Sequence, residues 1–143
     1  MTINLNDSEI AEVFGNADPR EHAAEAESRW GATDAYKESA VKTAGYSKED
    51  WQRVQAQTQA NIDAFVTAKQ SGLSAESVEA MAAAEAHRQQ ICEFYYACDY
   101  TMHTNLADMY IADQRFTSFY DKHAVGLAQY VRDAIYANAI SHS

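Results

Sequence analysis

The stretch from His87 to Asp113 constrains the fold most, because its apolar residues recur with helical periodicity. At 3.6 residues per turn, one face of its first half collects mostly apolar and aromatic side chains: Ala84, His87, Ile91, Phe94, Tyr95 and Cys98. After Asp99 the period resumes with Met102, Leu106, Met109 and Tyr110. The pattern predicts a helical hairpin whose corner lies at residues 98–100.

Five glycines and one proline divide the rest of the chain, each close to a place where a helical period stops or restarts. In the N-terminal part, the sequence predicts a helix at 7–14 capped by Asp7 or Ser8, a second from Asp18-Pro19 to Trp30, and a third from Thr33 or Asp34 to Gly45. A fourth helix runs from Ser47 to Gly72, a fifth is capped by Ser74, and a sixth follows Asp99. A short turn at 116–120 and a last helix at 125–139 complete the predicted elements. No segment alternates at period 2, so the sequence predicts an all-α fold without strands.

Length and charge set the outer limits of the interpretation. The 143 residues suit a single domain with one core. A formal net charge of -10 argues against a nucleic-acid surface, because phosphate binding needs clustered Lys and Arg. No run is long and apolar enough to cross a membrane, and the first ten residues lack the pattern of a signal peptide. We therefore expect a cytoplasmic protein that binds neither DNA nor a membrane by itself.

Histidines and cysteines of the hairpin are the candidates for metal or covalent chemistry. His87 and His103 suggest a haem or metal site, yet such sites need convergent ligands, and no second ligand lies one turn after His87. Cys98 and His103 could form a nucleophile pair, but no orienting group or oxyanion motif accompanies them. Cys92 and Cys98 lie too far apart on one predicted helix for a disulfide. The sequence favours free thiols, hydrogen-bonded histidines, no metal, no cofactor and no catalysis.

Aromatic side chains favour a binding role instead. Rings present large rigid surfaces at low entropic cost and can stack on flat heterocycles. The candidates are Trp30, Tyr36, Phe94, Tyr95, Tyr96, Tyr100 and Tyr110.

Several collinear motifs resemble one known family. They are RWGATDAYKES, YSKEDWQRV, HRQQI, FYYACDYTMH, LADMYIADQRFTSFYD and GLAQYVRDAIYANA, and the resemblance covers about residue 4 to residue 141. Together they resemble the antibiotic-recognition domain of thiostrepton-induced regulators, the effector part of MerR-type transcription activators.

The resemblance implies a globin-like helical core with a ligand cleft, and N-terminal helices that become ordered over the bound ligand. We expect one domain, with residues 1–45 as a mobile lid and residues 46–143 as the core. The lid segment has few bulky apolar side chains, and short helices are marginal in water without packing. The expected ligand-binding residues are Trp30, Tyr36, His87, Ile91, Phe94, Tyr95, Cys98, Met102, His103, Asn105, Leu106, Met109 and Tyr110.

The ligands that the resemblance implies are thiopeptide antibiotics, whose dehydroalanines can add a thiol. Cys98 matches the cysteine of the family's Tyr-x-Cys motif, whereas Asn105 stands where the founding member carries a second cysteine. Since an amide cannot replace a thiolate as nucleophile, we expect non-covalent binding, with at most slow capture by Cys98.

Two classes of function stay open at this point. In the first, the chain binds aromatic peptide antibiotics without catalysis, as the effector half of an activator joined to a MerR-type DNA-binding half, or as a protein that confers resistance by sequestering drug. In the second, it is a small globin-like protein that uses Cys98, His87 or His103 for thiol or haem chemistry.

Overall fold

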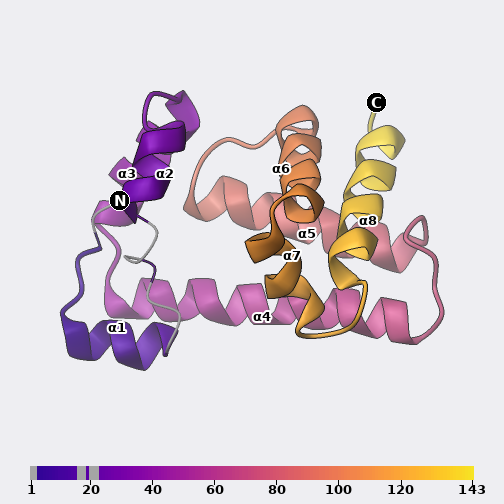
Figure 1. Cartoon of the computed structure of the whole chain (residues 1–143), viewed down its shortest axis with the longest axis horizontal. Coiled ribbons are helices and arrows are strands. Elements are labelled where there is room, and N and C mark those ends of the chain that lie inside the picture. Colours follow the sequence, from indigo (N-terminus) through magenta and orange to yellow (C-terminus); the bar gives the residue numbers. More distant parts are fainter. Residues whose placement is uncertain (1–2, 16–18, 20–22) are drawn as a thin grey trace. The chain divides into compact units, whose positions relative to one another are not determined.

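A computed structural model describes residues 3–15, 19 and 23–143. The described residues form α-helices and no β-strand, which confirms the predicted all-α fold (Figure 1). The helices are α1 (Asp7–Phe14), α2 (Ala23–Trp30), α3 (Asp34–Ala44), α4 (Lys48–Gln70), α5 (Val78–Phe94), α6 (Tyr100–Ala112), α7 (Gln114–Asp121) and α8 (Leu127–Ser141). Within the described part of the chain, no helix is both long and apolar enough to span a bilayer.

The chain divides into two compact units. Unit 1 comprises residues 1–57 and 90–97, and unit 2 comprises residues 58–89 and 98–143. The first part of α4 and the end of α5 therefore belong to unit 1, and the remainder of both helices belongs to unit 2.

Side-chain caps begin the helices much as the sequence predicts. The Ser47 hydroxyl accepts the N–H of Asp50, whose carboxylate accepts the N–H of Ser47, so the predicted reciprocal cap of α4 is present. Thr33 caps α3 by accepting the N–H of Tyr36. At the other end of α4, Gly72 adopts a positive φ of 78°, which a residue with a Cβ rarely does.

Four predicted boundaries need correction. Asn6 caps α1 through a reciprocal pair with Glu9, in place of Asp7 or Ser8. Ser77 accepts the N–H of Ala80 at the start of α5, whereas the hydroxyl of Ser74 bonds within the preceding turn. The predicted turn at 116–120 belongs to the helix α7, and the last helix runs from Leu127 to Ser141. The start of the second helix at Asp18-Pro19 falls partly outside the described residues.

Unit 1 has a small aromatic core. Trp51, Val54 and Phe94 are buried, and partly buried apolar side chains surround them: Ile3, Leu5, Val13, Phe14, Tyr46 and Tyr95. Ile10 of α1 is also only 2% exposed. Lys48 of α4 pairs with Glu12 of α1 at 2.7 Å. These contacts hold α1 to the first turns of α4.

Unit 2 has the larger core. It is lined by Ile62, Phe65, Ala80, Ala83, Ala84, Ala107, Tyr110, Tyr120, Leu127, Ala128, Val131, Ala134 and Ile135. Within this unit α6 and α8 lie side by side, and α7 contacts both (Figure 1). Alanines on α5 and α8 belong to this core together with the rings of Phe65, Tyr110 and Tyr120.

Candidate ligand-binding site

The end of α5 departs from the sequence prediction. Several candidate ligand-binding residues lie close to this helix end in the sequence. The helix ends at Phe94, so Tyr95 and Cys98 do not continue its apolar stripe as predicted. A helix end leaves carbonyls without intrahelical donors, and these must find partners elsewhere. The Cys92 carbonyl accepts from Lys42 Nζ at 3.2 Å, and the Phe94 carbonyl accepts from the Tyr46 hydroxyl. Side chains about fifty residues earlier thus stabilise the end of α5.

Phe94 belongs to an aromatic cluster in unit 1. Its ring lies 6.2 Å from that of Tyr46, and Tyr46 and Phe14 each make an edge contact with Trp51. Phe94 is 2% exposed, and the guanidinium of Arg53 lies over its ring at 5.3 Å. The buried Trp51 Nε1 has no hydrogen-bond partner among the described residues. Phe94 is therefore first of all a core residue of unit 1.

The other candidates in unit 1 differ in their exposure. Ile91 is buried, and its carbonyl accepts the N–H groups of Tyr95 and Tyr96. Tyr95 is half-buried, and burial raises its pKa to about 12, so its hydroxyl stays protonated at neutral pH. Trp30 and Tyr36 are half-buried on α2 and α3, and the guanidinium of Arg29 lies 4.5 Å from the Trp30 ring. These half-buried rings retain surface for a ligand.

In unit 2, His87 and His103 face each other across α5 and α6. His87 Nδ1 lies 2.8 Å from His103 Nε2, and the His87 ring also makes an edge contact with Tyr110. Burial lowers the pKa of His87 to about 4 and that of His103 to about 3. Both rings are therefore neutral at physiological pH. The predicted hydrogen-bonded role of His87 is confirmed.

The candidates on α6 fall on two faces of the helix. His103, Ala107 and Tyr110 form its buried face, whereas Met102, Leu106 and Met109 form a half-buried stripe along its flank. Asn105 is exposed. The stripe offers apolar, flexible side chains, and methionines adapt readily to irregular surfaces. We define it as the α6 stripe.

The two cysteines are both free, as predicted. Cys98 is 2% exposed, and its thiol donates to the carbonyl of Asp99 at 3.7 Å. Cys92 is half-buried in unit 1. Among the described residues, no group of three or more His, Cys, Asp and Glu side chains is placed to hold a metal ion.

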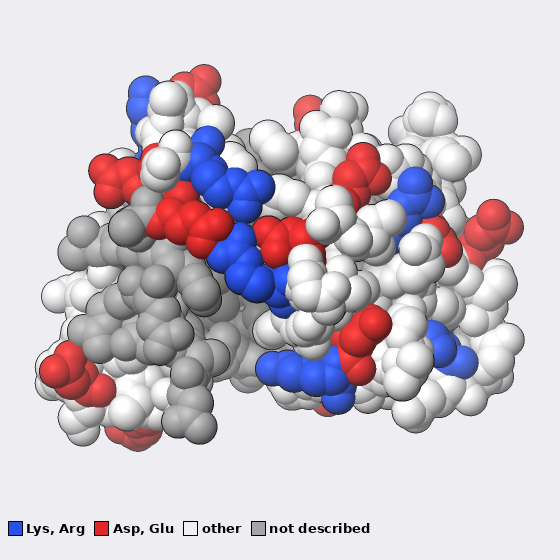
Figure 2. All heavy atoms as spheres, viewed as in Figure 1, with Lys and Arg blue, Asp and Glu red and all other residues white. Residues whose placement is uncertain are grey.

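Basic side chains are mostly neutralised by nearby carboxylates. Figure 2 shows Lys and Arg interspersed with Asp and Glu on the face that it presents. Glu85 and Asp108 pair with Arg88 and Arg132. Other ion pairs among the described residues include Arg29 with Glu25, Lys42 with Glu38, Lys48 with Glu12, Arg53 with Asp50, Arg115 with Asp113, and Arg132 with Asp133. In these pairs a carboxylate offsets the positive charge that a phosphate would need.

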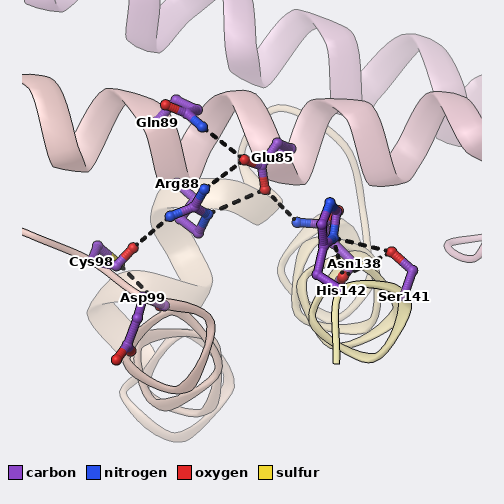
Figure 3. Close-up of polar contacts among 8 residues, drawn as sticks. All are labelled: Glu85, Arg88, Gln89, Cys98, Asp99, Asn138, Ser141 and His142. Atoms are coloured by element: carbon purple, nitrogen blue, oxygen red, sulfur yellow. Dashed lines mark hydrogen bonds and ion pairs between the residues drawn. The ribbon is translucent and has the colours of Figure 1, made fainter.

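Sequence reasoning missed a polar network in unit 2 that surrounds the corner before α6. The network (Figure 3) comprises eight residues: Glu85, Arg88, Gln89, Cys98, Asp99, Asn138, Ser141 and His142. The spacing of Glu85 and Arg88, three residues apart on a helix, is the one sequence signal that indicates their ion pair. The partners of that pair on α8 and at the corner come together only in the fold.

Comparison with solved structures finds two close matches. One is described as nosiheptide in complex with TipAS, from a thiopeptide antibiotic multidrug resistance system of Streptomyces lividans. It matches with a TM-score of 0.91 and 49% identity over 99% of each chain. The other, the antibiotic binding domain of a TipA-class multidrug resistance transcriptional regulator, matches with a TM-score of 0.60 and 47% identity over 65% of this chain and 99% of that one. The first match confirms the predicted globin-like helical fold.

Relatives found by sequence similarity agree with the structural matches. The HTH-type transcriptional activator TipA of Streptomyces coelicolor, like that of Streptomyces lividans, is 50% identical over the whole chain, which spans 56% of that protein. The HTH-type transcriptional activator mta of Bacillus subtilis is 31% identical over 68% of this chain and 37% of its own length. The chain thus spans about half the length of the TipA relatives. The model of the TipAS antibiotic-recognition domain matches residues 22–138, and the chain belongs to that family.

Proposed function

We propose that this chain binds thiopeptide antibiotics non-covalently and acts as the drug-sensing part of a transcription activator. The observation that carries the proposal is the match over nearly the whole chain to TipAS, a protein solved with nosiheptide bound. At 49% identity and a TM-score of 0.91 the two chains share a fold. The antibiotic-recognition family to which the chain belongs supports the same assignment.

The chemistry of the candidate residues suits a thiazole-rich macrocycle. The α6 stripe supplies adaptable apolar contacts, and the half-buried rings of Trp30, Tyr36 and Tyr95 supply stacking surfaces. Asn105, which is exposed on α6 next to the stripe, adds a polar group that could bind the ligand. Each of these groups would bind by stacking or by burial of apolar area, without a chemical step.

Non-covalent binding follows from the two positions where the family places thiols. Cys98 is buried, so its thiol is shielded from an electrophile, and Asn105 is not a nucleophile. We therefore propose that the protein holds the drug by contacts alone, without catalysis.

The regulatory part of the proposal rests on the relatives. Because TipA and mta are HTH-type activators, we place the chain as the effector portion of such a protein in the cytoplasm, where the promoter is. A drug-sequestering role would use the same binding site and needs no DNA-binding half. A fusion of this chain to a MerR-type DNA-binding half, with a reporter gene driven by the promoter that this half binds, tests the effector role, because drug should then raise expression.

A titration tests the binding itself. Purified protein is titrated with nosiheptide and followed by tryptophan fluorescence and amide NMR, with an antibiotic of another class as the control. We expect saturable binding of one equivalent of nosiheptide. No change in either signal at micromolar drug would refute the proposed function.

The thiol- or haem-based alternative finds little support in the geometry. His103 Nε2 contacts His87, and the Cys98 thiol donates to a backbone carbonyl, so both groups are engaged outside the alternative Cys98–His103 pair. An absorption spectrum of the purified protein tests this directly, since a Soret band would favour haem.

A further inference from the structure

An ion pair on α5 lies at the centre of the polar network in unit 2 (Figure 3). Arg88 donates to both carboxylate oxygens of Glu85, from Nε at 3.2 Å and from Nη2 at 2.7 Å. The two side chains are only 15% and 27% exposed. The hydrogen bond from Arg88 contributes most to lowering the pKa of Glu85 to about 2, so the pair is fully charged at neutral pH.

The third nitrogen of the same guanidinium reaches the corner before α6. Nη1 of Arg88 donates to the carbonyl of Cys98 at 2.8 Å. Cζ of the guanidinium lies 4.3 Å from the ring centroid of Tyr100, the first residue of α6. Between these two contacts lies Asp99, which caps α6 by accepting the N–H of Met102 at 2.8 Å. One side chain therefore holds the residues on both sides of the α6 cap.

The network continues to the end of α8. Glu85 also accepts a hydrogen bond from Asn138 at 3.0 Å, and Asn138 is 2% exposed. The Tyr100 ring stacks on His142 with a centroid distance of 4.7 Å and an interplanar angle of 12°. The start of α6 is thus fixed against both α5 and α8.

We propose that Arg88 is a positioning residue for ligand recognition, because it sets the start of α6 and thereby the placement of the α6 stripe. This inference rests on the proposed function, which assigns that stripe to the antibiotic. Arg88 does not itself contact the ligand; it acts through the Cys98 carbonyl and the Tyr100 ring. If α6 begins at a shifted position, Met102, Leu106 and Met109 move together with it.

Lysine cannot replace Arg88 in this role. A single ammonium group has no planar fork, so it cannot bond both oxygens of Glu85, reach the Cys98 carbonyl and lie over the Tyr100 ring at once. The Arg88→Lys variant keeps the charge and removes the geometry. It is therefore the variant that separates positioning from simple charge balance.

The test uses a Cys92→Ser parent, so that Cys98 is the one remaining thiol. Nosiheptide affinity and the rate at which a small aromatic disulfide modifies Cys98 are measured well below the melting midpoint of each variant. Arg115→Lys is the matched control, because Arg115 pairs with Asp113 at the start of α7 and is 48% exposed. For Arg88→Lys we expect about tenfold weaker binding and faster modification of Cys98, and for the control neither change.

A second variant covers the case in which Arg88→Lys does not fold. Tyr100→Leu leaves the Arg88–Glu85 pair in place and removes the ring beneath the guanidinium, so we expect weaker binding and faster Cys98 modification in the same direction. If the parent fails to bind nosiheptide, the proposed function is wrong. If the parent binds and both variants match its affinity and Cys98 rate, or lose affinity only in proportion to their unfolded fraction, the positioning role is overturned.

Discussion

Nδ1 of His87 lies 2.8 Å from Nε2 of His103, and both rings are neutral in the folded protein. A hydrogen bond between two imidazoles needs one nitrogen that carries a proton and one that does not. Protonating both rings would therefore replace the bond with repulsion inside a core that also desolvates them. The other ring nitrogen of His103 is buried without a hydrogen-bond partner among the described residues.

The first prediction is that acid destabilises the protein through this pair. Both histidines have folded pKa values below the ordinary 6.5, so between about pH 6.5 and pH 4 the unfolded chain binds more protons than the folded one. The free energy of unfolding should fall as the pH falls through this window, by up to about 1.4 kcal/mol per pH unit for each histidine. Urea denaturation at a series of pH values measures the slope.

A double variant isolates the source of that slope. His87→Gln with His103→Gln removes both titrating rings, so the stability should become nearly flat between pH 6.5 and pH 5. His123→Gln, in the turn after α7, is the control and should keep the slope. Glu85 adds its own loss only below about pH 4.5, because its folded pKa is about 2. An unchanged slope in the double variant would show that other groups carry the effect.

The second prediction concerns Phe94. Its ring is 2% exposed within the unit 1 cluster, so Phe94→Ala should lower the free energy of unfolding by about 3 to 5 kcal/mol. Phe119 of α7 is 39% exposed, and Phe119→Ala should cost about 1 kcal/mol or less. Thermal melts with and without nosiheptide make the comparison. A normal melting temperature with lost nosiheptide binding would place Phe94 in the ligand site instead of the core.

Local signals predict much of this fold, whereas distant contacts decide the rest. The caps at Thr33 and Ser47 are predictable because each uses a side chain within three residues. The end of α5 is not, because no glycine or proline marks it and the carbonyls of Cys92 and Phe94 are satisfied by Lys42 and Tyr46. The helical period continues through Cys98 in the sequence although the backbone leaves the helix.

The candidate residues also divide into those that local sequence signals predict and those that distant contacts decide. Periodicity finds the apolar face of α6, yet the stripe of Met102, Leu106 and Met109 lies beside the buried face of His103 and Tyr110 instead of on it. Hydrophobicity alone does not distinguish the two faces, because apolar residues occur on both. The Arg88 network is missed for another reason: its partners Cys98, Tyr100 and Asn138 lie ten or more residues away along the chain.

The third prediction is that a dehydroalanine-containing thiopeptide leaves the protein unmodified. Intact-mass spectrometry under denaturing conditions should give the mass of the free protein after incubation with drug. Asn105 is exposed on α6, so Asn105→Cys in a Cys92→Ser parent should install a thioether and add the mass of the drug. The parent without the new cysteine is the control. An adduct on Cys98 in the natural protein would show that its burial does not protect it.

The last prediction concerns the N-terminal segment of residues 1–45, which we propose becomes ordered by the ligand. This segment carries Trp30 and Tyr36 on helices with few bulky apolar side chains. A flat hydrophobic ligand can supply the packing surface that these helices lack, which couples binding to folding. Such coupling costs roughly 2 to 5 kcal/mol or more, the free energy needed to order the segment. It also gives an activator its signal, because an ordered segment can bias a two-state equilibrium.

The three helices of this segment should not respond equally. Ile10 and the Glu12–Lys48 pair hold α1 to α4, and Lys42 of α3 donates to the Cys92 carbonyl. Trp30 of α2 is half-buried and is a candidate for stacking on the ligand. We therefore expect the amides of α2 to gain the most protection from hydrogen exchange when drug binds, and those of α1 and α3 to gain less. Amides of residues 85–106 should change little and serve as the internal reference. Equal protection of α2 with and without nosiheptide, in a protein that binds the drug, would show that the segment is ordered before the ligand arrives.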